Sequence, residues 1–567
     1  MADRNSAARR LLELCPKLGV DYVFTNLGSD HPAFIEAFAS LTAAGAPMPK
    51  VIVCPHEMTT LSAAHAYAML TRRPQLVLVH VDVGTQNLGC SVHNAARGRI
   101  PALIVAGLSP VTATGERVGA RNEFIHFTQD VPRQQEIVSQ YMKWCYELRA
   151  AETVADVLAR GVQIATSPPE GPVYITGARE VWDVEVPETV NTAMQWRPTR
   201  LAGLPGDAVS ELCTALAASS RPLVITTYLG RHPDAVNRLT ALSERFGIGV
   251  CEVTPQYVNF PGDHPHHLGY RRNRYVAEAD LILMLDVDVP WIPSKVAPAH
   301  DAKVFHIDAD PIKLGLGAWH FPALARYQAD TGVALEQLLE AQSTPPSGRD
   351  ARRTWIADAR RRAQESVSAA GSGPITSEEL TLAVRDLIDD RTVVIVEEPS
   401  GSESIPSILR MRTPGNYCGM GGAGLGWGIN AAIGAKLARP DATVITLTGD
   451  GCYLFGVPSS AYWVAGTYRT PHLTIIYNNG GWHSPRLSTG WVHPDGAATR
   501  HDAFWVTIGK GARLADLAAA TGGADAFRVT DRQDLRPVLD RALATVRSGR
   551  SAVVDVLLNS VSEQVLG

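Results

Sequence analysis

The stretch GDGCYLFGVPSSAYWVAGTYRTPHLTIIYNNGGW, residues 449–482, decides the fold and indicates where a ligand would bind. Its first residues, Gly449 and Asp450, follow the β-branched run ATVITLT, and Asn478 and Asn479 follow the apolar run LTIIY. Such runs predict buried parallel strands, whose carboxyl ends meet at the edge where open α/β sheets bind ligands. Because carboxylate and amide oxygens suit Mg²⁺, we expect a metal site there.

Two further segments are typical of loops that bind phosphate. GNYCGMGGAGLGWGINAAIGAKLARP (415–440) is dense in glycine and runs into an alanine-rich helix, and EEPSGSES (397–404) follows the apolar run TVVIV. Glycine lets the backbone approach a ligand closely, and free amides in a loop or at a helix start attract anions. The glycine density therefore predicts a backbone that lies against a flat aromatic ring and a phosphate group.

Apolar runs alternate with alanine-rich helical stretches along the whole chain, which predicts α/β domains with doubly wound parallel sheets. The runs fall into three series, separated by polar connectors at 181–200 and 342–366, and the second connector becomes an arginine-rich helix. We therefore expect three domains, at 1–187, 188–350 and 351–567.

Composition narrows the class of protein. The chain has 567 residues and a net charge of −5, from 52 Lys and Arg against 57 Asp and Glu, so it has no basic surface typical of nucleic-acid binding. Its apolar runs are too short for a membrane span, and the amino terminus lacks the pattern of a secretion signal. The eight cysteines are scattered without a Cys-x-x-Cys pair. We expect a cytoplasmic enzyme without nucleic-acid or membrane partners.

Gly-Asp-Gly, 26 intervening residues and Asn-Asn together resemble the cofactor motif of thiamine-diphosphate enzymes. The resemblance implies thiamine diphosphate and Mg²⁺ as cofactors, and pyrimidine-binding, central and diphosphate-binding domains. It also implies roles for individual residues. The metal ligands would be Asp450, Asn479 and the carbonyl of Gly481; the diphosphate would bind at Ser400 and Gly401; Ala423 and Leu425 would contact the ring system; and Gly449, Gly451, Cys452 and Trp482 would surround the cofactor.

The first domain carries CPHEMTTLSAAHAYAM (54–69), in which Glu57 stands between a predicted strand and a predicted helix. A glutamate at a helix start is also favoured by the helix dipole alone. The resemblance implies that Glu57 contacts the aminopyrimidine ring and activates the cofactor. In this family that glutamate serves a cofactor held by another subunit, so we expect a homodimer or homotetramer with the active site at the subunit interface.

On the substrate side the chain resembles benzoylformate decarboxylases and acetolactate-synthase-like proteins. The resemblance implies that Ser29 contacts the substrate, that His80 assists proton transfer and that Gln129 faces the active site. A histidine at the end of a buried strand is also often a core residue. The segment VDVPWIP (287–293) falls where a second catalytic histidine would stand. Arg486 follows the predicted metal-binding segment 478–481, and its side chain could bind a carboxylate or remain at the surface.

The expected reaction makes or breaks a C–C bond next to a carbonyl, most simply in a 2-oxo acid, by decarboxylation or acyloin-type ligation. One alternative is cleavage of a 2-hydroxyacyl-CoA, for which the basic segment GYRRNRYV (269–276) would be relevant. Another is a non-catalytic or regulatory protein of the same fold. The segment VFHIDADP (304–311) occurs in relatives with and without flavin, and we do not expect FAD.

Overall fold

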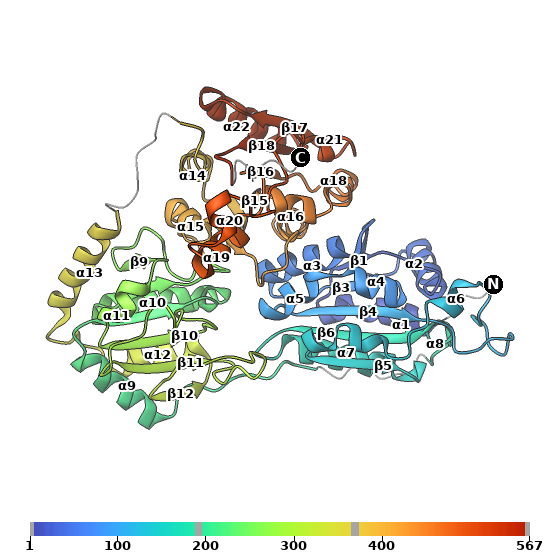
Figure 1. The fold of residues 1–567 in the computed structure, drawn as a ribbon. Coiled ribbons are helices and arrows are strands. Elements are labelled where there is room, and N and C mark those ends of the chain that lie inside the picture. Colours follow the sequence, from blue (N-terminus) through green and yellow to red (C-terminus); the bar gives the residue numbers. More distant parts are fainter. Residues whose placement is uncertain (1–4, 188–195, 365–372, 562–567) are drawn as a thin grey trace.

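The computed structural model describes residues 5–187, 196–364 and 373–561. It contains three sheets of six parallel strands, each with helices on its faces, arranged as three lobes (Figure 1). The expected fold class, three doubly wound α/β domains, is confirmed.

The first sheet has the order β2-β1-β3-β4-β6-β5 and carries the amino-terminal third of the chain. Its residues alternate between two buried layers because helices cover both faces. The strands are β1 Tyr22–Thr25, β2 Lys50–Val53, β3 Leu76–Val79, β4 Ala102–Leu108, β5 Trp144–Leu148 and β6 Pro172–Ala178. The main helices are α1 Ala7–Leu14, α2 Pro32–Ala44, α3 Glu57–Thr71, α4 Val81–Asn87, α5 Cys90–Arg97 and α7 Val154–Thr166.

The central sheet has the order β12-β11-β10-β7-β8-β9. Its strands are β7 Pro222–Thr226, β8 Gly249–Glu252, β9 His267–Gly269, β10 Leu281–Leu285, β11 Lys303–Asp308 and β12 Ala325–Gln328. The helices are α9 Gly206–Ala218, α10 Pro233–Phe246, α11 Asn273–Glu278, α12 Thr331–Ala341 and α13 Arg349–Gln364.

Helix α13 packs against this central domain. Arg352 is buried and donates to the carbonyls of Phe246 (2.7 Å) and Ala217 (2.9 Å), and Ile356 lies in the central core. We therefore propose a second domain boundary after α13, instead of at residues 350/351. The expected boundary at 187/188 borders residues 188–195, which lie outside the described part of the chain.

The third sheet has the order β14-β13-β15-β16-β18-β17. The strands are β13 Thr392–Glu397, β14 Tyr417–Gly419, β15 Thr443–Gly449, β16 Leu473–Asn478, β17 Ala524–Val529 and β18 Ser551–Leu557. The helices include α14 Ser377–Arg385, α15 Ser404–Leu409, α16 Gly428–Ala438, α17 Asp450–Phe455, α18 Pro458–Thr467, α19 His483–Val492, α20 Ala497–His501 and α22 Arg532–Arg547.

The first and third domains share a core, formed where α3 crosses α16. A Cβ atom on Gly434 of α16 would lie 1.8 Å from the carbonyl oxygen of Ala63 of α3, so only glycine permits this close approach. Thr59 and Ser460 also bond through their hydroxyls, at 2.9 Å. These contacts hold α3, whose first turn begins at Glu57, against the third domain of its own chain.

A buried ion-pair network joins the first domain to the central domain. Arg99 donates to Asp308 and Asp288, each at 2.8 Å, and Lys313 lies 2.7 Å from both carboxylates. The ring of Tyr228 lies under the guanidinium of Arg99, whose central carbon is 4.5 Å from the ring centroid. Asp308 of the segment VFHIDADP is thus engaged by the side chains of Arg99 and Lys313, whereas Asp310 accepts the backbone N–H of Lys313 at 3.0 Å.

Within the described ranges, no helix combines the length and the apolar character needed to cross a membrane.

Candidate cofactor and active site

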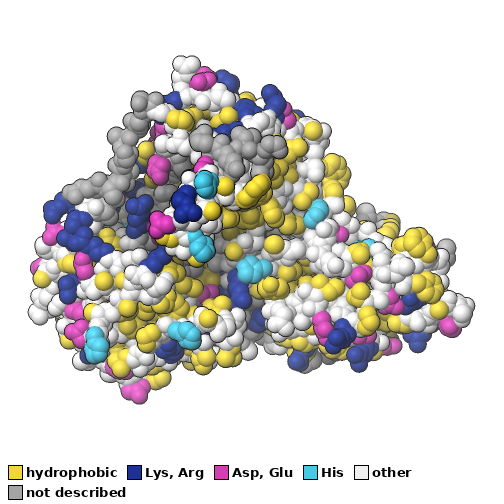
Figure 2. Space-filling view, in the orientation of Figure 1, with side chains coloured by type: hydrophobic (Ala, Val, Ile, Leu, Met, Phe, Trp, Pro, Cys, Tyr) yellow, Lys and Arg dark blue, Asp and Glu magenta, His cyan; other side chains and the backbone are white. Residues whose placement is uncertain are grey.

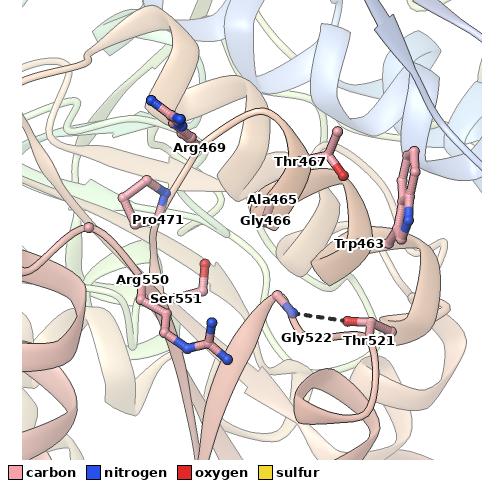
Figure 3. Close-up of a pocket in the computed structure, with 12 residues that line it drawn as sticks. Trp463, Ala465, Gly466, Thr467, Arg469, Pro471, Thr521, Gly522, Arg550 and Ser551 are labelled. Atoms are coloured by element: carbon pink, nitrogen blue, oxygen red, sulfur yellow. Dashed lines mark hydrogen bonds between the residues drawn. The ribbon is translucent and has the colours of Figure 1, made fainter.

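Two cavities lie at opposite ends of the strands of the third sheet, within the part of the chain that the structure describes. One, of about 400 Å³, lies where β18 begins, and is lined by Trp463, Arg469, Thr521 and Arg550 among others (Figure 3). The other, of about 520 Å³, lies at the carboxyl ends of β13, β15 and β16. Open α/β sheets bind ligands at the carboxyl ends of their strands, so the larger cavity is the candidate site.

Most of the residues expected around the cofactor line this cavity. They come from four loops that meet at one sheet edge: Ser400, Ala423, Leu425, Gly449, Asp450, Gly451, Cys452, Asn479, Gly481 and Trp482. Gly401 lies just beneath the surface, with its backbone N–H donating to Glu398. The cavity also takes in Thr254 and Pro255, because the central domain lies against the glycine-rich loop.

The side chain of Asp450 binds the backbone of the predicted metal-binding segments, residues 449–451 and 478–481. Its side chain is buried, with one oxygen accepting N–H bonds from Gly480 (2.7 Å) and Gly481 (3.0 Å) and the other accepting from Gly451 (2.7 Å). Burial raises its pKa to about 6 although these amides oppose the shift. A cation would stabilise a carboxylate desolvated in this way, and the amide oxygen of Asn479 could add a second hard ligand.

The two asparagines of the motif are placed differently. Asn478 is fully buried and donates to Asp555 at 2.8 Å, so it supports the sheet. Asn479 is only half-buried and lines the cavity. This division fits the expectation that the second asparagine, and not the first, is available to a metal ion.

Two glycines let the segments around the cavity pack closely against each other. A Cβ on Gly451 would lie 2.4 Å from the indole nitrogen of Trp482, and a Cβ on Gly481 would lie 2.2 Å from the carbonyl oxygen of Val506. Glycine at both positions therefore lets the predicted metal-binding segment 478–481 and Trp482 close over the sheet edge. An oxygen-donor pair at a strand edge, a glycine-lined floor and an apolar wall fit a diphosphate held through a divalent cation beside an aromatic ring system.

Two acidic residues at the end of β13 are part of the site, although the sequence analysis assigned them no role. Glu397 accepts backbone N–H bonds from Gly426 (2.6 Å), Trp427 (3.0 Å) and Gly428 (2.6 Å), and so anchors the glycine-rich loop to the sheet. Glu398 bonds to the Ser400–Gly401 turn. Burial raises the pKa of each carboxyl to about 7. The only sequence signal was a pair of charges directly after a buried run.

We expect Glu397→Ala to lower the free energy of unfolding by about 3 kcal/mol or more, because three buried amides lose their acceptor and each costs roughly 1–3 kcal/mol when unpaired. Glu397→Gln, which keeps one acceptor oxygen, should lose less. Thermal unfolding by calorimetry measures both, with the exposed Glu136→Ala as control. Equal melting temperatures for wild type and Glu397→Ala would contradict this anchoring role.

Glu57, Ser29, His80 and Gln129 lie in the first domain, and among the described residues none of that domain lines the cavity. Glu57 is buried at the first turn of α3, where Asn87 donates to its carboxylate. A Cβ on Gly84 would lie 3.2 Å from Glu57 Oε1 and 3.4 Å from the Cβ of His80, so the two side chains flank the same glycine. The structure thus brings Glu57 and His80 together at a site of their own.

The other substrate-side residues join this second cluster. Gln129 hydrogen-bonds His80 through its side chain, and Ser29 bonds to His126 at 3.1 Å. Burial alone would lower the pKa of His80, but its hydrogen bond to Asp30 raises it above the ordinary value. The four expected catalytic residues therefore lie near the carboxyl ends of the first sheet, apart from the residues expected to bind the cofactor.

Two segments considered for the substrate side, around Trp291 and Arg486, have other packing partners in the structure. Trp291 is buried in the central core, edge-to-face with Phe321 at 5.4 Å, so the segment VDVPWIP does not reach the cavity. Arg486 pairs with Asp502 at 3.1 Å and lies over the ring of Phe504, which engages its guanidinium within its own chain. Both differences arise from packing partners distant in sequence.

Three family models match the chain in order. They are described as the N-terminal TPP binding domain, the central domain and the C-terminal TPP binding domain of thiamine pyrophosphate enzymes, and they match residues 5–137, 209–338 and 403–556.

Individual relatives agree with these matches. Benzoylformate decarboxylase of Pseudomonas aeruginosa is 27% identical over 553 residues, covering 94% of this chain and 96% of that one. The large subunit of acetolactate synthase isozyme 1 of Escherichia coli is 25% identical, covering 76% and 74%. The solved 4-hydroxybenzoylformate decarboxylase of Rhodococcus jostii RHA1 has the same fold, with a TM-score of 0.80 over 98% of this chain and 99% of that one, at 23% identity. The chain therefore belongs to the thiamine pyrophosphate enzyme family.

Proposed function

We propose that this protein is a thiamine-diphosphate- and Mg²⁺-dependent lyase or carboligase that breaks or forms the C–C bond next to the carbonyl of a 2-oxo acid. The observation that carries the proposal is the cavity at the third sheet edge, where Asp450 and Asn479 face a glycine-lined floor. The names of the benzoylformate decarboxylase and acetolactate synthase relatives support a 2-oxo acid as substrate.

In this proposal Asp450, Asn479 and the Gly481 carbonyl hold Mg²⁺, and the turn at Ser400 and Gly401 binds the diphosphate. The Ala423 carbonyl would accept a hydrogen bond from the aminopyrimidine, and Leu425 would support the cofactor, with Gly449, Gly451, Cys452 and Trp482 around it. When bound, the cofactor supplies the electron sink for C–C bond cleavage. The residues of the chain bind it, orient it and exclude water.

The active unit is proposed to be a homodimer or a homotetramer. Glu57 lies outside the cavity of its own chain, so a second copy must bring Glu57 of the partner subunit to the cofactor. Exposed apolar side chains support such an assembly, both in the first domain (Val111, Val118, Phe124 and Phe127) and in the third (Trp491, Val492 and Trp505). Figure 2 shows hydrophobic side chains gathered on the third domain toward the first. Patches of this kind mark interfaces.

The substrate is proposed to lie between this cofactor and the cluster of Ser29, His80 and Gln129, with His80 moving the proton. The 2-hydroxyacyl-CoA alternative receives less support, because the basic residues of GYRRNRYV have partners within the chain. Arg274 pairs with Glu278 at 2.7 Å, and Arg272 donates to the carbonyl of Pro290 at 2.7 Å. A non-catalytic role is disfavoured because Asp450, Asn479 and Glu57 are all present. We keep a cytoplasmic location as an expectation from the sequence.

The proposal is tested by incubating the purified protein with thiamine diphosphate, Mg²⁺ and a panel of aromatic and aliphatic 2-oxo acids. We expect CO₂ release from at least one acid, with an aldehyde or an acyloin as product, and none when Mg²⁺ is chelated. Cofactor binding without turnover of any 2-oxo acid, together with cleavage of a 2-hydroxyacyl-CoA, would favour the alternative reaction. Failure to bind thiamine diphosphate would refute the proposal.

A further inference from the structure

Asp30 is the most enclosed carboxylate of the first-domain cluster, and the sequence analysis gave it no role. It follows β1, is 2% exposed, and one of its oxygens is hydrogen-bonded by His80 Nδ1 while the other accepts the backbone N–H of Val81 at 3.2 Å. Burial alone would raise the pKa of Asp30, yet its hydrogen bonds with His80 and with the backbone N–H of Val81 help to hold it below its ordinary value. The carboxylate is therefore ionised, and Nδ1 of His80 donates the proton in this bond.

The second histidine beside Asp30 does not compete for this role. His31 is fully buried, and its Nδ1 accepts the backbone N–H of Gly28 at 3.0 Å, although the same atom lies 3.1 Å from the Asp30 carboxylate. A nitrogen that accepts an N–H bond carries no proton to donate. Burial lowers the pKa of His31, which keeps the ring neutral. His80 is thus the imidazole that donates to Asp30.

The backbone around this pair is built to accommodate it. A Cβ on Gly107 would lie 1.7 Å from Asp30 Oδ2, and a Cβ on Gly28 would lie 2.0 Å from His80 Nδ1. Val81, the residue that donates to Asp30, has a φ of +22°, which is rare for a β-branched residue. Unusual backbone of this kind persists where surrounding contacts hold it, and it concentrates at functional sites.

We infer that Asp30 is a positioning residue that holds His80 by Nδ1 and leaves its other ring nitrogen to deliver the proton in the reaction. The inference deepens the proposed function and rests on it. The His80 side chain remains 16% exposed, so part of the ring stays accessible although the side chain of Gln129 also bonds to it. An Asp–His pair fixes both the tautomer and the orientation of an imidazole that must give up or take a proton.

Five groups lie around His80, and each can influence the pH at which its imidazole titrates. Asp30 and Gln129 bond to it; Asp82 acts through charge from α4; His31 lies with its ring centroid 6.4 Å away; and Glu57 approaches across Gly84. Asp82 offers a matched control, because Asp82→Asn removes a nearby charge without removing a bond to the imidazole.

The test follows the titration of His80 by NMR in the full chain labelled with [¹³Cε1]-histidine, without cofactor, and His80→Gln assigns the resonance. We expect His80 in the wild type to titrate above the ordinary value of about 6.5. Asp30→Asn should lower its pKa by about one unit or more, as expected when a bonded opposite charge is lost. Asp82→Asn should cause a clearly smaller shift.

A second measurement separates this inference from the proposed function. At saturating thiamine diphosphate and Mg²⁺, Asp30→Asn should lower kcat and move the His80-dependent limb of the pH–rate profile to lower pH, with unchanged cofactor affinity by calorimetry. If the wild type did not bind thiamine diphosphate, the proposed function would be refuted, but the titration of His80 would still test the contact with Asp30. A wild-type His80 pKa at or below about 6.5 would overturn the inference without any variant. An unchanged titration in a folded Asp30→Asn would also overturn it.

Discussion

Asp450→Asn is expected to weaken the binding of thiamine diphosphate in the presence of Mg²⁺ by at least about a hundredfold, or about 2.7 kcal/mol. The amide keeps an oxygen for the N–H groups of Gly480 and Gly481 but removes the negative charge that the cation needs. Isothermal titration calorimetry at fixed Mg²⁺ measures the loss.

The asparagine variant is more informative than alanine at this position. The carboxylate accepts three backbone bonds inside the protein, so Asp450→Ala would also leave buried amides unpaired and loosen the loop. Asp525→Asn is the matched control, since it makes the same change on β17 in a side chain that is 45% exposed and pairs with Arg550. If Asp450→Asn bound thiamine diphosphate as tightly as Asp525→Asn does, Asp450 would not be a metal ligand.

Glu57→Gln is expected to slow the exchange of the thiazolium proton with deuterium by about a hundred- to ten-thousandfold, the range typical of a lost acid–base group. The glutamine keeps the shape of the side chain and can still accept the bond from Asn87. It cannot transfer a proton to the aminopyrimidine ring, so activities on all donor substrates should fall together. Quenched-flow NMR of the bound cofactor measures the exchange rate directly.

Two controls isolate the chemistry of Glu57 from its placement. Calorimetry should find that Glu57→Gln still binds thiamine diphosphate, although more weakly. Glu136→Gln, at an exposed site in the same domain, should exchange at the wild-type rate. If Glu57→Gln also exchanged at the wild-type rate, Glu57 would not be the activating carboxylate.

Much of the fold could be predicted from local patterns. The long apolar runs became interior strands such as β4, β10 and β15, because a strand buried on both faces must be apolar along its length. Five strands without a long apolar run in the sequence, β5, β9, β12, β14 and β17, are the outermost strands of their sheets, where burial is incomplete and the pattern is weak. The interior strands β1 and β8 also lack a long apolar run, and β8, GVCE, begins with Gly and ends with Glu, which weakens the strand pattern.

The position of the cofactor site also followed from the sequence. Asp450 and Asn479 stand directly after two neighbouring parallel strands, and the geometry of such strands brings their carboxyl ends to one edge. Predicting this site required no information about contacts with other parts of the chain, since β15 and β16 pair directly.

By itself, then, the sequence determined three parallel α/β domains and one sheet edge rich in glycine, acid and amide groups. Only the tertiary structure decided that Glu397 holds the glycine-rich loop, that Asp30 holds His80 and that Trp291 belongs to the central core. The physical reason is that strand and turn formation depend on neighbouring residues, whereas the partner of a buried charge or ring is chosen by packing between segments far apart in sequence.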